Sequence, residues 1–206
     1  MSILGISTGY HDASISIIDN DGNITYAGHS ERYSKRKNDH TLNEDIFATA
    51  LGTSVITDIA YYEKPFLKQL RQLYQGSGFN FKQICTRQIL NNSIPSKAKK
   101  RIGTGYRTQS YPHHKSHAAA GFQTSPYKDA TVVVIDAIGE FDTITIWHAE
   151  YDSKGYARYK KLWSRGYPHS IGLFYSAMTK RAGLRPLDEE YILMGMAAYA
   201  VPSFKM

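Results

Sequence analysis

The chain has 206 residues, 42% of them hydrophobic, which suits one domain or one lobe of a larger protein and excludes a disordered chain. A single cysteine, Cys85, excludes an internal disulfide and a cysteine-based zinc site. It fits a reducing cytoplasm, and we expect its side chain to be buried. Because no apolar run approaches the roughly 20 residues that span a bilayer and no signal-peptide pattern is visible, we expect a cytoplasmic protein without membrane contact.

The formal net charge of +7 favours anionic partners such as phosphates, nucleotides or nucleic acid. The excess is local: it lies in residues 32–37 and in residues 96–101, with Arg87 and Arg107 near the second run. A solvated loop explains each run equally well. Nucleic-acid binding therefore remains one of the open functions.

The predicted elements begin with an antiparallel meander. Residues 2–8 form a short apolar strand, and residues 13–19 alternate Ile and Ser with the period of a half-buried strand. The Asn-Asp-Gly-Asn turn at residues 20–23 leads into a third strand at residues 24–28.

Downstream, helices alternate with buried strands. The pattern predicts helices at 43–52, 66–74, 113–122, 170–182 and 189–198, and strands at 55–62, 130–136, 142–149 and 156–164. Residues 79–105 show no clear pattern. This order predicts an α/β fold with a ribonuclease-H-like (actin-like ATPase) lobe, in which helices flank a mixed sheet that contains the three-strand meander. Many other folds share the order.

The loop between the first two predicted strands is a candidate anion site. Gly9 and Ser14 would let a phosphate approach backbone N–H groups closely. Between them, His11 and Asp12 could contact a phosphate, a metal or a transferred group. Composition alone favours a plain hairpin turn instead.

Two histidines are candidate metal ligands. His113 and His117 are four residues apart, so on a helix both imidazoles would lie on one face and grip a single metal ion. A carboxylate or water must add to them. A solvated helix face is the alternative explanation.

Two later segments carry further candidates. Asp136 ends the clearest strand and is followed by Gly139 and Glu140, a common place for a carboxylate that handles a metal or phosphate, although it could equally cap a turn. Ser170 and Gly172 could open a helix whose N-terminus faces an anion, although core packing explains that helix as well.

Taken in this order, the segments resemble the N-terminal domain of the O-carbamoyltransferase family over nearly the whole chain. The matching motifs are Gly9–Ser14, Glu31–Lys37, His113–Ala118, Asp136–Glu140, Ser170–Tyr175 and Glu190–Ala200. Ala137, Ala198 and Ala200 depart from the family, which has Gly, Pro and Gly at these positions.

The resemblance implies an actin-like ATPase fold related to the tRNA threonylcarbamoyl transferase. It implies transfer of a carbamoyl group from carbamoyl adenylate, made from carbamoyl phosphate and ATP, to a hydroxyl of a substrate. The basic runs leave two acceptor classes open, because they could steer a modified nucleic-acid base to the transferase in place of a small molecule. His113, His117 and Asp136 would hold a divalent metal, expected to be iron, with zinc or magnesium as alternatives.

The resemblance also distributes the remaining roles. His11, Asp12 and Lys37 would lie near the acyl group and phosphate, and His11 or Asp12 would take the proton of the attacking hydroxyl. We expect ATP or carbamoyl adenylate to contact Gly9, Ser14, Gly139, Glu140, Ser170 and Gly172.

The resemblance also implies which domains the chain contains. We expect residues 1–206 to be an N-terminal lobe that lacks the second lobe and the adenylate-forming domain, is inactive alone, and needs a second polypeptide to supply them. The alternative is an inactive nucleotide- or nucleic-acid-binding module that kept the fold.

Overall fold

The computed structural model describes residues 1–10 and 12–201, and the chain forms two compact units, Met1–Ser116 and His117–Met206. We call them the N-terminal and C-terminal units. Helix α6 (His113–Gln123) begins in the first and continues in the second.

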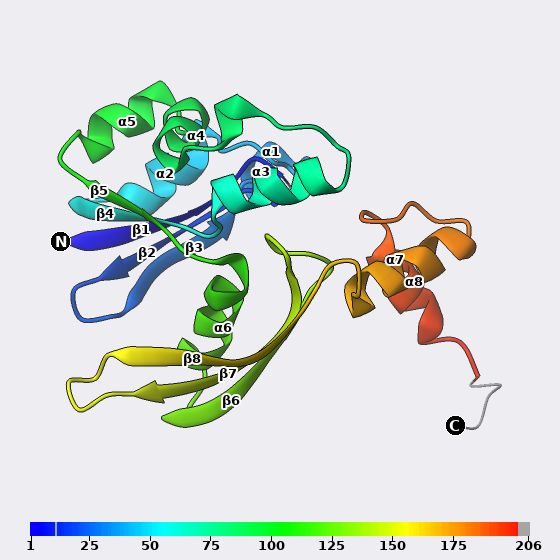
Figure 1. The fold of residues 1–206 in the computed structure, drawn as a ribbon. Helices are drawn as coiled ribbons and strands as arrows, with labels where there is room; N and C mark the ends of the chain where they lie inside the picture. Colours follow the sequence, from blue (N-terminus) through cyan, green and yellow to red (C-terminus); the bar gives the residue numbers. More distant parts are fainter. Residues whose placement is uncertain (11, 202–206) are drawn as a thin grey trace. The chain divides into compact units, whose positions relative to one another are not determined.

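The N-terminal unit contains a five-stranded sheet with the order β3-β2-β1-β4-β5 (Figure 1). Its strands are β1 (Ser2–Ser7), β2 (Ser14–Asp19), β3 (Ile24–His29), β4 (Ile56–Tyr61) and β5 (Arg107–Ser110). β1, β2 and β3 form an antiparallel meander, while β4 runs parallel to β1 and β5 parallel to β4. The predicted α/β class, mixed sheet and meander are confirmed, and the strand order is that of a ribonuclease-H-like lobe.

The alternating pattern of β2 explains its position. Ile15 and Ile17 are 2% and 0% exposed and enter the core, while the serines between them lie on the other face. At the end of β2 the Asp19 carboxylate accepts hydrogen bonds from the N–H groups of Asp21 and Asn23, which closes the turn into β3.

Helices connect the strands of this unit. They are α1 (Glu31–Ser34), α2 (Glu44–Leu51), α3 (Pro65–Tyr74), α4 (Thr86–Ser93) and α5 (Ser96–Ile102), with a short 3-10 turn at Phe81–Gln83. α2 begins as predicted, because the Asn43 side chain accepts a hydrogen bond from the N–H of Ile46. α2, α4 and α5 gather on one face of the sheet, where their apolar residues join the core (Figure 1).

The C-terminal unit contains a three-stranded antiparallel sheet with the order β6-β7-β8. Its elements are β6 (Asp129–Ile135), β7 (Asp142–Tyr151), β8 (Ala157–Gly166), α7 (Ile171–Arg181) and α8 (Glu190–Ala197). α6 packs on one face of this sheet through Ala118, which meets Val134 and Trp147 in a small buried cluster. All three strands were predicted. Within the described residues, no helix combines the length and apolarity needed to cross a membrane.

Candidate functional site

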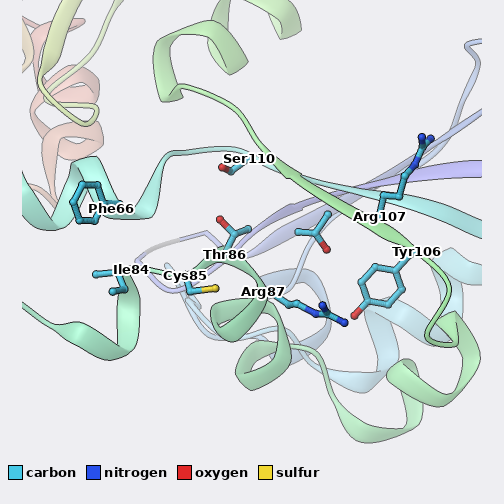
Figure 2. A pocket seen from close by; sticks show the side chains of 9 residues that line it. Phe66, Ile84, Cys85, Thr86, Arg87, Tyr106, Arg107 and Ser110 are labelled. Carbon is cyan, nitrogen blue, oxygen red and sulfur yellow. The ribbon is translucent and has the colours of Figure 1, made fainter.

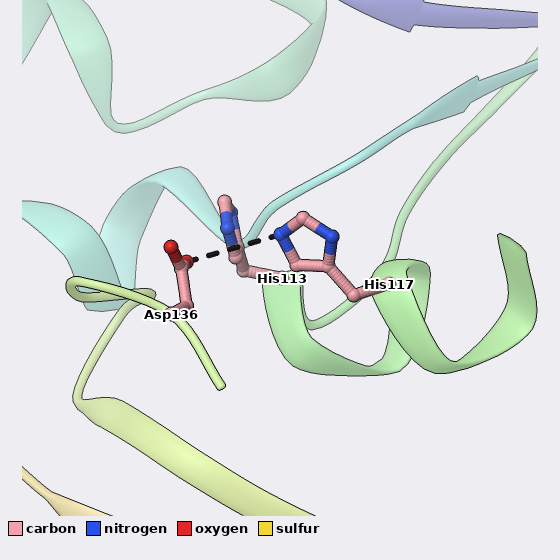
Figure 3. Close-up of side chains that lie close together, drawn as sticks. All are labelled: His113, His117 and Asp136. Atoms are coloured by element: carbon pink, nitrogen blue, oxygen red, sulfur yellow. Dashed lines mark ion pairs between the residues drawn. The ribbon is translucent and has the colours of Figure 1, made fainter. Parts of the chain in front are cut away.

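The two predicted histidines and the predicted aspartate lie together. His113 and His117 are one turn apart on α6, and Asp136 follows β6 (Figure 3). One ligand atom from each of the three lies within 4.8 Å of the others. His117 Nε2 is 3.8 Å from Asp136 Oδ2, with side chains 53% and 28% exposed, so an incoming ligand has access. The spacing argument therefore placed both imidazoles correctly on one helix face.

The first turn of α6 is fastened to the end of β4. Ser116 Oγ donates a 2.8 Å hydrogen bond to the carbonyl of Tyr62. The Tyr62 ring meets the His113 ring edge-on, with 5.5 Å between ring centroids. Burial, with the Glu63 carboxylate adding to it, raises the pKa of Tyr62, so its hydroxyl stays protonated. These contacts fix where the histidine-bearing face points.

Asp136 is held from two directions. Its N–H donates to the Thr143 carbonyl at 2.9 Å, and its Oδ1 accepts from the N–H of Ala137 at 2.7 Å. Ser170 Oγ donates to the Ala137 carbonyl at 2.7 Å and accepts from the N–H of Leu173, so it caps α7. The start of α7 is thereby tied to the carboxylate-bearing loop.

Gly172 allows that close approach. A Cβ atom on Gly172 would lie 2.6 Å from the Cα of Ala137, a distance at which the backbone must shift. Nearby, the N–H of Gly139 donates to the Asp142 carbonyl at 2.9 Å, and Glu140 is only 7% exposed. The structure thus brings these predicted residues together around Asp136. Ser170 and Gly172 hold the start of α7 against the Asp136 loop. Their contact with a nucleotide stays a prediction.

The loop after β1 is held by a distant segment, which a plain hairpin turn would not require. The N–H of Gly9 donates to the His40 carbonyl at 3.1 Å, and the N–H of Ala13 donates to the Asp39 carbonyl at 2.7 Å. Thr8 Oγ1 also donates to His40 O. Gly9 has φ +93°, a conformation that favours glycine.

The remaining predicted residues of this loop are placed as follows. Asp12 is half-buried with φ +48°, and Ser14 begins β2 opposite Ser7. His11 lies outside the described residues. Lys37 is exposed and lies two residues before Asp39, whose carbonyl accepts a hydrogen bond from the N–H of Ala13.

Asp39 is a supporting residue that the sequence analysis missed. It is 5% exposed, and its Oδ1 accepts hydrogen bonds from both the N–H and the hydroxyl of Thr41. Hydrogen bonds from Ser34 and Thr41 lower the pKa of Asp39 to about 2. The Asp-His-Thr sequence is a local turn signal that could have identified it.

A second missed group follows the carboxyl end of β4. Lys68 Nζ lies 2.9 Å from Glu63 Oε1 and 4.9 Å from the centre of the Tyr10 ring, and Glu63 is only 5% exposed. Since β1 and β4 are parallel, their carboxyl ends meet at one edge, where ligands of α/β sheets bind. Charged residues directly after a buried strand were the available signal.

A pocket in the N-terminal unit lies apart from these residues. It encloses about 800 Å³, and its lining includes Phe66, Cys85, Arg87 and Tyr106 (Figure 2). The expectation that Cys85 is buried was wrong, because it is exposed where the chain enters α4 at the surface. A pocket of about 390 Å³ in the C-terminal unit includes Ser170 in its lining.

Comparison with known proteins gives one family. The family model described as carbamoyltransferase N-terminus matches residues 2–205. The chain is 29% identical over 223 residues to the uncharacterized protein sll1178 of Synechocystis sp. (strain ATCC 27184 / PCC 6803 / Kazusa), covering 98% of this chain and 35% of that protein.

A second relative is the uncharacterized protein MJ1058 of Methanocaldococcus jannaschii, 27% identical over 152 residues, with 68% of this chain and 25% of that protein covered. The chain thus matches about a third or less of the length of these relatives. Among solved structures, YeaZ from Pseudomonas aeruginosa aligns with a TM-score of 0.42 and 12% identity, covering 81% of this chain and 67% of that one.

Proposed function

Because the chain belongs to the family of carbamoyltransferase N-terminal domains, we propose that it supplies the transfer site of an O-carbamoyltransferase. The proposed reaction moves a carbamoyl group from carbamoyl adenylate to a substrate hydroxyl. Carbamoyl transfer is the family's general activity. The adenylate donor, the hydroxyl acceptor and the metal are our extension of it.

The observation that carries the proposal is the cluster of His113, His117 and Asp136. Two imidazoles and one carboxylate, with ligand atoms within 4.8 Å of one another, are a donor set typical of iron(II), and they also suit zinc. The set fits magnesium less well, because magnesium prefers oxygen ligands. A metal bound there would act as a Lewis acid toward a carbonyl or phosphate oxygen.

The chain's own residues prepare this site. The hydrogen bonds of Ser170 and Ala137 keep the Asp136 carboxylate at the end of β6, and the contact with Tyr62 orients the first turn of α6. Pre-set ligands avoid reorganisation when a substrate arrives. The exposed ring of His117 leaves one side open to the acceptor.

In the N-terminal unit, the loop held by Asp39 and His40 is proposed to bind the donor. Gly9 lets a phosphate approach the backbone, and Lys37 supplies a positive charge to it. Asp12 is proposed to accept the proton from the acceptor hydroxyl. The match covers 35% of the relative sll1178. We propose that carbamoyl adenylate is made by a domain that corresponds to the unmatched part of such relatives.

The basic cluster gives little support to a nucleic-acid acceptor. Lys97 Nζ lies 2.8 Å from a Glu44 oxygen, and Arg107 Nε lies 2.8 Å from an Asp58 oxygen. Arg101 donates a hydrogen bond to the Gly52 carbonyl. Because these cations have partners within the chain, we favour a small hydroxyl compound as acceptor.

The proposal is tested by calorimetric binding of a non-hydrolysable carbamoyl-adenylate analogue to the chain loaded anaerobically with iron(II). We expect the analogue to bind more tightly than AMP, and His117→Ala and Lys37→Ala each to weaken it at least about tenfold. His29→Ala, an exposed histidine of β3, is the matched control and should change nothing.

Two results would contradict the proposal. Equal affinity for the analogue and for AMP would indicate a module that only retained nucleotide binding. Equal iron content in the wild type, His117→Ala and Asp136→Asn would remove the metal site on which the proposal depends.

A further inference from the structure

Three side chains of types that bind metals lie close together where β6 begins and β7 ends. Asp129 begins β6, and it pairs directly with Glu150 of β7; His148 is two residues before Glu150 on the same strand. Because side chains of a strand alternate between faces, all three lie on one face. Val134 and Trp147, which pack against α6, lie on the other.

The distances suit a metal ion. His148 Nε2 is 3.2 Å from each carboxylate oxygen of Asp129, and one ligand atom from each of the three residues lies within 4.8 Å of the others. A tetrahedral metal with bonds of about 2.1 Å holds its ligands about 3.4 Å apart. The spacing between His148 and Asp129 is already close to this value, and the Glu150 ligand atom lies within 4.8 Å of both. The Asp129 and His148 side chains are 68% and 35% exposed, so water can complete the coordination.

The charges also favour a cation. Like charges directly opposite each other in an antiparallel pair are destabilising, and Asp129 faces Glu150. Arg158 is opposite Glu150 in register, but its guanidinium holds Asp152 at 2.6 Å. In the described part of the chain, neither carboxylate forms an ion pair with a lysine or arginine.

Two lysines near the group do not neutralise it. Lys128 places its Nζ 5.1 Å from the centre of the Tyr151 ring, and Lys160 is the register partner of His148. The Lys160 side chain therefore leaves the sheet on the same face as the imidazole and adds a positive charge to that face. It opposes a bound cation.

We propose that Asp129, His148 and Glu150 form a second metal site, for a divalent ion such as zinc, which ties the start of β6 to the end of β7. One imidazole with two carboxylates favours a borderline metal over magnesium or calcium, which prefer oxygen ligands only. This site is separate from the cluster on α6 and does not depend on the carbamoyl-transfer proposal. By joining two strands it stabilises the C-terminal sheet.

The test is zinc titration of the full chain by calorimetry, followed by thermal unfolding with and without zinc. All variants carry His117→Ala, so that the cluster on α6 lacks a ligand. We expect one zinc per chain and a higher Tm with zinc. His148→Gln should lower zinc affinity at least about tenfold and abolish the Tm increase. His29→Gln, on an exposed strand of the other sheet, is the control and should match its parent.

Two further variants keep the test decisive. Glu150→Gln preserves size on an exposed position and should also weaken zinc binding, so it replaces His148→Gln if that variant fails to fold. Lys160→Gln should strengthen binding, because it removes a positive charge from the face that carries the imidazole.

Equal zinc affinity in His148→Gln, Glu150→Gln and His29→Gln overturns the site. Zinc binding without a rise in Tm overturns its role as a tie between strands, and equally tight magnesium binding overturns the metal preference.

Discussion

The two units bury their apolar side chains very differently. In the N-terminal unit a continuous core joins the sheet to α2, α4 and α5, with Ile17 and Ile46 both 0% exposed. In the C-terminal unit, among the residues that the structure describes, the buried apolar cluster is small and consists of Ala118, Val134 and Trp147. Two threonines of β7, Thr143 and Thr145, occupy fully buried positions there.

The C-terminal unit also leaves large apolar side chains in water. Ile135 is 56% exposed and Phe174 is 62% exposed, and α8 has no buried residue among those described. Its elements are joined by specific hydrogen bonds instead, such as Ser176 Oγ to Glu190 Oε1 at 2.6 Å. We therefore expect the N-terminal unit to draw its stability from burial, and the C-terminal unit to depend on a few close contacts.

The largest expected effect is loss of core packing in the N-terminal unit. Ile17→Ala removes apolar atoms from a fully buried position and should lower the free energy of unfolding by about 2–5 kcal/mol. Urea unfolding followed by far-UV circular dichroism measures this. Both tryptophans, Trp147 and Trp163, lie in the C-terminal sheet, so fluorescence reports that unit separately. The Ile17→Ala change should appear in circular dichroism and leave the fluorescence transition in place.

Ile135→Ala is the matched control in a strand of the other unit. Since this side chain is already exposed, its removal should change stability by no more than about 0.5 kcal/mol. A cost equal to that of Ile17→Ala would mean that the apolar face of β6 is covered in solution. The contrast between the units would then disappear.

The second expected loss of stability comes from the close contact between Gly172 and the Asp136–Ala137 backbone in the C-terminal unit. Gly172→Ala forces a Cβ against the Asp136–Ala137 backbone and should cost about 1–3 kcal/mol in the fluorescence-detected transition. Gly195→Ala in α8 meets no atom within 4 Å and should instead stabilise by about 0.5–1 kcal/mol, because alanine favours helix. Similar effects of the two changes would show that α7 does not rest on the Asp136 loop.

The regular elements were predictable because their residues carry a clear period. The Ile-Ser alternation of β2 and the valines of β6 determine strands locally. α4 and α5 were not predicted, since both are short and rich in polar or basic residues. Their signal is faint: Leu90, Ile94 and Ala98 enter the core at four-residue intervals across a proline.

Site residues divide in the same way. The His113–His117 pair follows from spacing along one helix, so the sequence placed it. The hydrogen bonds that join the Gly9 loop to Asp39 and His40 could not be predicted. Thr8 and His40 are separated by 32 positions and meet only through the fold. No local pattern encodes such a contact.

The smallest of the three expected losses of stability concerns the segment that holds the Gly9 loop, and it depends on pH. The pKa of Asp39 is lowered to about 2 by its hydrogen bonds, so the charged form stabilises the folded chain. This contribution is complete above the ordinary aspartate pKa near 4 and is lost as the pH falls toward 2. Asp39→Asn should cost about 1–2 kcal/mol at neutral pH, and the difference from wild type should vanish near pH 2. Asp21→Asn, in the exposed β2–β3 turn, is the control. Urea unfolding followed by circular dichroism at several pH values decides the matter, because a difference that persists at pH 2 means that Asp39 supports the loop by shape and not by charge.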